Sequence, residues 1–216
     1  MIYDGDAANI TRGLWKQWNI DLASFGAGVQ NVTTLSIGID GNGASGTLYF
    51  DDIGLHPSAP EPPLEIWIEA EAAASITSPM KIYNDPLASG GQYIGTDDGI
   101  GDESGNPPPD GIATYNFTVQ GGTYKILLLV SITGGSNSFW VRIPGATYSP
   151  GTHGSGWIRF NGISDGAEWH WDEVHSDDHG QQVVKITLPA GQHTLEIARR
   201  EDGALLDAIL ITEDVE

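Results

Sequence analysis

Two carboxylates one residue apart, Glu69 and Glu71 in the stretch IEAE, are the first side chains whose spacing suggests chemistry. On a β-strand such residues point to the same face, so the two charges lie side by side. The pair is tolerated when a cation bridges it or when one carboxyl is protonated. Calcium takes only oxygen ligands, and Asp207 and the carbonyls of LASGGQY could complete its set. The alternative is an edge strand whose carboxylates face solvent, and the spacing alone leaves both open.

A second ionisable group is the loop 168–179, in which His170, His175 and His179 stand among five carboxylates. Imidazole and carboxylate groups together bind zinc or copper, and an open coordination position can activate water. The helical H-E-x-x-H spacing is absent, and the segment is typical of a strand followed by a turn. It is interpreted as a solvated acidic loop, as a metal-binding loop, or as the site of a small metal-dependent polysaccharide hydrolase or lyase.

Other catalytic patterns are weaker. Ser155 lies beside His153 in GTHGSGW, but a G-x-S-x-G nucleophile elbow needs a following helix, and the sequence predicts none there. Phosphate-binding loops and dinucleotide fingerprints are absent. The chain has no cysteine, which excludes disulfides, thiolate metal sites and cysteine nucleophiles.

Charge restricts the partners. The 216 residues carry a formal net charge of −20, which repels phosphate backbones and anionic membranes. This charge argues against nucleic acid and against a membrane surface as partners. No apolar run has the length of a transmembrane helix, and the first residues lack the features of a signal peptide. Together with the domain organisation, this favours a piece of a longer exported protein, with a secreted location.

Short strands separated by turn residues dominate the rest of the chain. Most alternate apolar and polar residues, and Gly, Asp, Asn or Pro lie between them, as in VQGGTY and LPAGQHT. About nine such strands in about 150 residues are typical of an antiparallel β-sandwich of the jelly-roll type. The sequence therefore predicts an all-β fold. The expected strands are 65–71, 111–119, 123–132, 138–143, 156–160, 168–174, 181–188, 193–200 and 205–212.

A proline-rich segment, residues 58–64, divides the chain, because proline lacks the backbone donor and disfavours both helix and sheet pairing. Before it, residues 1–57 contain three strand-like runs, which are too few to close a core alone. We interpret them as the C-terminal fragment of an upstream β domain, which would add a few N-terminal strands. Residues 65–216 are the second and complete β domain.

Four motifs in order give this second domain a resemblance. The opening IEAE, the early ASGGQYIG, the turn AGQHTLEI and the closing LLDAILIT resemble carbohydrate-binding modules of families 6 and 35 over residues 65–212. Those modules are β-sandwiches attached to secreted polysaccharide-degrading enzymes. The resemblance implies a polysaccharide or oligosaccharide ligand, a tethered catalytic domain, no catalysis by the module, and a structural Ca²⁺ held by Glu69, Glu71 and Asp207.

The sugar site needs exposed aromatic rings beside fixed polar groups. The resemblance places Tyr93 beside the sugar, whereas Trp169 and Trp171, on one face of a strand, form either a stacking platform or part of the core. One departure is Leu205, where the family carries a ligand-binding asparagine. The polar residues Arg200, Glu201 and Asp202 of the preceding RREDGA loop are the alternative for that role, so sugar specificity cannot be transferred. The candidate ligand-binding residues are Tyr93, Asn137, Arg142, Trp157, Trp169, Trp171, Glu201 and Asp202.

Overall fold

The computed structural model describes residues 64–103 and 105–214, and before them only residues 18–22, 34, 36–38, 47, 49–50 and 53–54. The chain divides into two compact units, Met1–Pro62 and Pro63–Glu216. The strands expected in residues 1–57 and the linker 58–64 lie almost entirely outside the described residues, so their assignment to an upstream domain stays a prediction. The account below concerns the second unit.

The larger sheet of this unit, sheet A, has eight strands, all paired antiparallel. Its order is β3-β4-β15-β6-β13-β8, with β1 paired to β15 and β10 paired to β6. These strands are β1 (Glu65–Glu69), β3 (Lys81–Asn84), β4 (Gln92–Gly95), β6 (Gly122–Ile132), β8 (Thr147–Ser149), β10 (Gly166–Glu173), β13 (Lys185–Leu188) and β15 (Leu205–Glu213).

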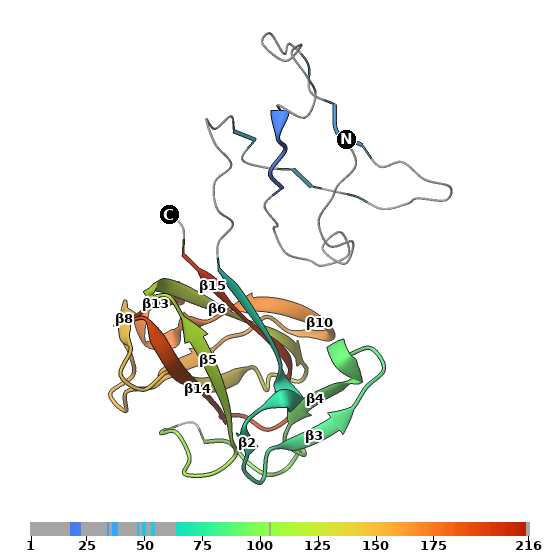
Figure 1. Ribbon diagram of the computed structural model, residues 1–216. Helices are drawn as coiled ribbons and strands as arrows, with labels where there is room; N and C mark the ends of the chain where they lie inside the picture. Colours follow the sequence, from blue (N-terminus) through green and yellow to red (C-terminus); the bar gives the residue numbers. More distant parts are fainter. Residues whose placement is uncertain are drawn as a thin grey trace. The chain divides into compact units, whose positions relative to one another are not determined.

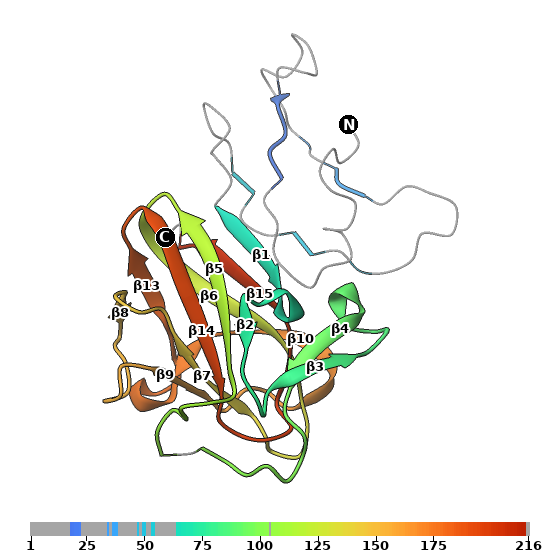
Figure 2. The same ribbon diagram turned by 60° about the horizontal axis from the view of Figure 1, so that its bottom comes forward.

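The smaller sheet, sheet B, has five antiparallel strands in the order β2-β5-β14-β7-β9. They are β2 (Ser75–Ile76), β5 (Ile112–Val119), β7 (Ser138–Arg142), β9 (Ile158–Asn161) and β14 (Gly191–Arg199). Figures 1 and 2 show the two layers of strands. The predicted all-β antiparallel sandwich is therefore confirmed.

The remaining elements of the second unit are short. They are the pair β11 (His175–Ser176) and β12 (Gln182–Val183), and the 3₁₀ turns η4 (Ala70–Ala72), η5 (Ser89–Gly91) and η6 (Asp177–His179). No helix among the described residues has the length and apolar character needed to cross a membrane.

Alternation along the strands builds the core between the sheets. In β6 every second side chain, from Tyr124 to Ile132, is buried in the main core cluster, because successive side chains of a strand point to opposite faces. Strand β5 contributes Ala113, Tyr115, Phe117 and Val119 to that cluster in the same way. The sequence period thus decided which face of β5 and of β6 is interior.

The opposite face of sheet A carries aromatic residues. Leu129 of β6 lies outside the core cluster and is paired across the sheet with Trp171 of β10, so both point away from the core. Trp67 of β1 is paired with Leu210 of β15 on the same outer face. The rings of Trp67 and Trp171 meet edge to face, with centroids 5.1 Å apart. Trp169 and Trp171 therefore do share a face, and it is the outer one.

Candidate functional site

Three acidic residues from distant parts of the sequence meet at one end of β15. Glu69 ends β1, and Glu71 follows in the turn η4. Asp207 lies in β15 at a register shift between Leu206 and Ala208; such an irregularity re-aims a side chain relative to the regular ladder. Asp207 is fully buried. We call Glu69, Glu71 and Asp207 the carboxylate cluster.

Few donors reach this cluster. Trp67 Nε1 donates to Glu69 Oε1 at 3.0 Å, and Ser89 Oγ donates to the same oxygen at 2.9 Å. The Ser89 backbone N–H donates to Asp207 Oδ2 at 2.9 Å. The second oxygen of each carboxylate (Glu69 Oε2, Glu71 Oε2 and Asp207 Oδ1) is buried without a hydrogen-bond partner among the described residues. Unpaired buried carboxylate oxygens are costly unless a cation or a proton joins them.

A glycine brings the β3–β4 turn close to the cluster. Gly90 has a φ of +65°, and a Cβ added there would lie 2.8 Å from Glu71 Oε1 and 3.8 Å from Glu69 Oε2. Only a residue without a side chain fits both this backbone conformation and this contact. The glycine-rich stretch that was expected to supply oxygen ligands therefore does lie against the carboxylates.

The electrostatics of the cluster are unfavourable for three ionised groups. Burial raises the pKa of Asp207 to about 6, opposed by the Ser89 N–H and reinforced by the negative charges of Glu69, Glu71 and Asp85. Burial, together with the charge of Glu69, also raises the pKa of Glu71. A bound cation would reverse these shifts, because it favours the ionised form.

Among residues 64–103 and 105–214, no group of three or more His, Cys, Asp or Glu side chains is disposed as a metal centre. What the carboxylate cluster offers a hard cation is its three unpaired carboxylate oxygens, which are a ligand type that calcium uses. The chemistry of the donor set suits calcium.

A row of aromatic rings lies beside the cluster. Tyr83 of β3 and Tyr93 of β4 are a direct cross-strand pair, with ring centroids 5.2 Å apart and planes 9° from parallel. Trp169 of β10 lies against the other side of Tyr93, at 5.3 Å and a tilt of 55°. We call Tyr83, Tyr93 and Trp169 the ring row. All three are partly exposed.

Polar groups fix both ends of the ring row. Trp169 Nε1 donates to Asp85 Oδ2 at 3.2 Å. At the other end, Tyr83 Oη donates to Asp97 Oδ1 at 2.7 Å, and Lys81 Nζ donates to Asp97 Oδ2 at 2.7 Å. Burial and the bond to Asp97 raise the pKa of Tyr83, so this hydroxyl stays protonated. The rings are thus held in place from both sides.

Three other predicted ligand-binding residues lie in loops at an end of the sandwich. Glu201 Oε2 accepts hydrogen bonds from the Asn137 N–H at 2.8 Å and from Ser138 Oγ at 2.6 Å. Asp202 Oδ2 accepts from the N–H groups of Gly99 and Gly101 at 2.7 and 3.0 Å. Asn137, Glu201 and Asp202 are therefore brought together with loop backbone and not with the ring row, and the acidic side chains tie loops to one another.

Arg142 and Trp157 meet on sheet B instead. The Arg142 guanidinium lies 4.2 Å from the Trp157 ring centroid and donates to Glu196 Oε2 at 2.7 Å. Trp157 is 5% exposed and packs with Trp140, which is fully buried. Trp157 therefore belongs to a small second core and adds no open ring surface.

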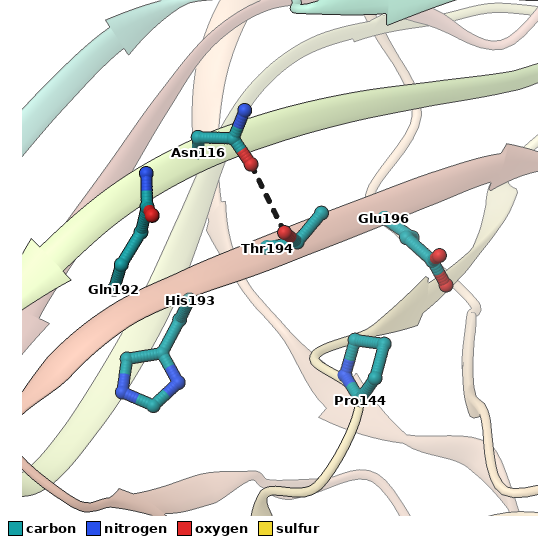
Figure 3. Close-up of a pocket in the computed structure, with 6 residues that line it drawn as sticks. All are labelled: Asn116, Pro144, Gln192, His193, Thr194 and Glu196. Carbon is teal, nitrogen blue, oxygen red and sulfur yellow. Dashed lines mark hydrogen bonds between the residues drawn. The ribbon is translucent and has the colours of Figure 1, made fainter.

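A hollow lies on this side of the sandwich (Figure 3). Thr194 Oγ1 donates to Asn116 Oδ1 at 3.0 Å across its floor, where β14 and β5 pair. The lining residues are Asn116, Pro144, Gln192, His193, Thr194 and Glu196. With no tryptophan or tyrosine in its lining, this hollow lacks a ring on which a sugar could stack.

The three histidines of the loop 168–179 have separate partners. Both ring nitrogens of His170 face main-chain oxygens, those of Glu168 and Ser164, at 2.9 and 3.0 Å. His179 Nδ1 lies 2.8 Å from Ser176 Oγ. These contacts hold the loop 161–180 together, and the imidazoles do not share a centre among the described residues.

His175 shows the same pattern as His170. Its Nδ1 and Nε2 lie 3.0 Å from the carbonyl oxygens of Glu173 and Asn161, and Asp172 Oδ1 lies 3.5 Å from Nδ1. Burial lowers the pKa of His175, but the bonds to Asp172 and to the two carbonyls outweigh it and raise the pKa above its ordinary value. Only the imidazolium can donate to both carbonyls.

Sequence reasoning did not single out Tyr83 and Asp85, and it named the stretch LASGGQY without the hydrogen bonds of Ser89. All three lie on the β3–β4 hairpin, whose strands have only four residues each. The stretch KIYNDP did carry a signal, since an alternating KIYN followed by Asp-Pro is typical of a short strand entering a turn.

No protein-family model and no curated protein matches the chain. Among solved structures, it matches the C-terminal CBM6 of LamC from Zobellia galactanivorans at 15% identity, over 69% of this chain and 100% of that chain, with a TM-score of 0.46. It matches a CBM35 from Paenibacillus barcinonensis at 15% identity, over 69% and 99%, with a TM-score of 0.47.

A third similar structure is the Podospora anserina GH26-CBM35 β-(1,4)-mannanase, at 16% identity and a TM-score of 0.47. The match covers 70% of this chain but only 28% of the mannanase. The function therefore has to be inferred from the residues of the chain itself.

Proposed function

We propose that residues 65–212 form a non-catalytic carbohydrate-binding module that carries a calcium ion as a structural staple. Its role is to hold an attached polysaccharide-degrading enzyme, in an exported protein, against its substrate. Tethering raises the local concentration of the catalytic domain at the polymer without adding chemistry. The ring row on the outer face of sheet A is the observation on which this proposal rests.

Sugar rings present C–H faces that stack on aromatic side chains, and hydroxyls that need polar partners nearby. The ring row supplies the first requirement on an exposed sheet face, and Asp85 and Asp97 at its ends supply the second. Tyr93 has a ring on each side of it. Its role is therefore to position its neighbours, and Trp169, at the end of the row, is the ring that takes the sugar.

Glu69, Glu71 and Asp207 would hold the calcium ion. When bound, calcium would offset two of the three negative charges and link the segments that carry the carboxylates. The residues fit because each carboxylate has one buried oxygen that no donor occupies, and because Gly90 leaves room for the turn to approach. Glu69, the turn η4 and Asp207 would then be joined by ionic contacts as well as by the β1–β15 ladder.

The first experiment is a binding screen of the full chain against cellulose, xylan, mannan, β-1,3-glucan and pectin. Retention is measured with and without a calcium chelator, and the same tubes are assayed for new reducing ends. Retention without product supports the binding module. Released sugar would refute the proposal and direct attention to the loop 168–179.

Two variants then place the site. Trp169→Ala is expected to weaken polymer binding at least tenfold with a near-native circular dichroism spectrum, since the ring is partly exposed. His193→Ala, in the hollow of sheet B, is the matched control and should leave binding unchanged. Loss of binding in the His193 variant alone would move the site to sheet B.

A further inference from the structure

The β3–β4 turn connects the carboxylate cluster to the ring row. The turn spans residues 85–91, and its two ends are joined by the Asp85 N–H, which donates to the Gly91 carbonyl at 3.1 Å. Inside it, the Ala88 N–H donates to the Asp85 carbonyl at 3.0 Å, and the Leu87 N–H donates to Asp85 Oδ1 at 2.9 Å. These bonds make the turn one compact unit.

One end of this unit is fixed to the carboxylate cluster. Ser89 reaches two of the three carboxylates, Glu69 through its hydroxyl and Asp207 through its N–H, both at 2.9 Å. The next residue, Gly90, lies against Glu71. If the carboxylates change position, the backbone at residues 89 and 90 must therefore move with them.

The other end of the unit is fixed to the ring row. Asp85 Oδ2 accepts the indole N–H of Trp169 at 3.2 Å, across 84 residues of sequence. The other oxygen of Asp85 is held inside the turn by the Leu87 N–H. Asp85 therefore transmits the orientation of the turn to the indole of Trp169.

We propose that the Asp85–Gly91 turn couples the two sites, so that a cation in the carboxylate cluster orients Trp169 through Ser89 and Asp85. Asp85 is a positioning residue for the ring row. This inference rests on the proposed function and adds how glycan binding is regulated. Glycan affinity depends on calcium, although the ion does not contact the sugar. A cation shifts an equilibrium only by its preference for one arrangement, and here the preferred arrangement is the one with the turn docked on the cluster.

The tryptophans provide a test that needs no glycan. Three indole N–H groups report on three places: Trp67 Nε1 donates to Glu69 in the cluster, Trp169 Nε1 donates to Asp85, and Trp140 Nε1 donates to the Glu103 carbonyl at 3.0 Å beside sheet B. Their signals in a ¹H–¹⁵N spectrum of the full chain are assigned with single Trp→Phe variants. Calcium chloride is then titrated into the chelated protein.

The expected result is that the Trp67 and Trp169 signals shift with the same calcium midpoint while Trp140 does not move. If Trp67 shifts and Trp169 stays fixed, the coupling is wrong and the calcium site stands. If neither signal moves, the calcium site itself is wrong, and with it the coupling. The three outcomes are therefore distinguishable from one another and from a failure to bind glycan.

Two variants test the route. In Ser89→Ala, the Trp67 signal should still titrate, because the three carboxylates remain, and the shift of Trp169 should fall to less than half. In Asp85→Ala, Trp67 should titrate normally and Trp169 should no longer respond. A full Trp169 response in both variants would overturn the assignment of the turn as the link.

A polysaccharide retained in the binding screen gives the last readout. For the unmodified chain, chelation of calcium should raise the dissociation constant for the polysaccharide at least threefold. In Asp85→Ala, chelation should not change that dissociation constant further. Equal affinity with and without calcium in the unmodified chain would contradict the coupling while leaving carbohydrate binding intact.

Discussion

The second unit gathers acidic side chains in two regions, and only one of the two contains buried arginines that pair with them. In the loops around β14, the buried guanidinium of Arg200 lies 3.2 Å from Glu201, and that of Arg199 lies 2.8 Å from Glu103. In the carboxylate cluster, no Lys or Arg among the described residues forms an ion pair with Glu69, Glu71 or Asp207. The first region is complete by itself, whereas the second lacks positive charge.

The same difference appears in two aspartates of the closing hairpin. The N–H groups of Gly101 and Gly99 lower the pKa of Asp202, whereas burial raises the pKa of Asp207, only five residues later, to about 6. Each of the seven Lys and Arg residues between 64 and 214 already lies within 4.0 Å of a carboxylate. No Lys or Arg of residues 64–214 is therefore left to supply positive charge to the cluster.

The largest expected effect concerns the loops around β14, where Arg200 pairs with Glu201. Arg200→Ala removes the cation that faces Glu201, together with its hydrogen bonds to Ser138 Oγ and Asn161 Oδ1, and leaves a mostly buried carboxylate without its counter-charge, which should cost about 3–5 kcal/mol of unfolding free energy. Urea denaturation measures it, and the loss should be the same with and without calcium. Arg200→Lys, which keeps the charge, is the control and should recover part of the loss. A calcium-dependent loss would show that the two regions are not independent.

The cluster should respond to calcium by a smaller amount. At pH 7.5, above the pKa of Asp207, calcium at a hundred times its dissociation constant should stabilise the chain by about 2.7 kcal/mol, seen as a rise in melting temperature. Asp207→Asn removes one charge and keeps the shape, so it should abolish this gain while leaving the chelated protein no less stable. Asp202→Asn is the matched control and should keep the full calcium response. An undiminished response in Asp207→Asn would remove this residue from the site.

Gly90 tests the approach of the turn to the cluster. Gly90→Ala puts a methyl group 2.8 Å from Glu71 Oε1 at a φ of +65°, so we expect a loss of about 1 kcal/mol from backbone strain and a several-fold higher calcium midpoint. Gly134→Ala has a similar φ of +69° with nothing within 4 Å, and should show the strain without the calcium effect. Equal calcium midpoints in the two variants would argue against a close turn.

The smallest effect concerns His175, outside both regions. Because its pKa is raised in the folded state, the imidazolium stabilises the fold below about pH 6.5, the ordinary histidine value, and this contribution is lost as pH rises through the folded pKa. His175→Gln should therefore cost about 1 kcal/mol at acid pH and less at pH 8, measured by urea denaturation. Asp172→Asn should flatten the same pH dependence. A cost that does not vary with pH would mean that the ring is neutral throughout.

The alternation of apolar and polar residues, together with the residue types in the turns, predicted much of the fold. The long strands β5, β6, β14 and β15 all lie where alternating apolar residues between glycine-rich turns placed them, because a strand of eight or more residues carries enough alternation to be recognised. The short strands β2, β3, β4, β8 and β11 were missed. A run of two to four residues has no usable period, and its pairing depends on the sheet edge to which it is added.

In the carboxylate cluster, too, the sequence identified some residues, whereas other contacts became visible only in the structure. Glu69, Glu71 and Asp207 could be named because they lie in the motifs IEAE and LLDAILIT at the two ends of the domain. The stretch LASGGQY was also expected beside them, but not that Ser89 donates two hydrogen bonds to the carboxylates or that Gly90 packs against Glu71.

The sequence by itself determined a β-sandwich, the interior faces of its alternating strands and the presence of an acidic pair, because these follow from local alternation and composition. Only the tertiary structure decided that Tyr93 lies between Tyr83 and Trp169, that Trp157 is buried under Arg142, and that Glu201 and Asp202 serve their own loops. Such contacts join residues tens of positions apart, and strand order and register, which local sequence encodes weakly, decide which of them form.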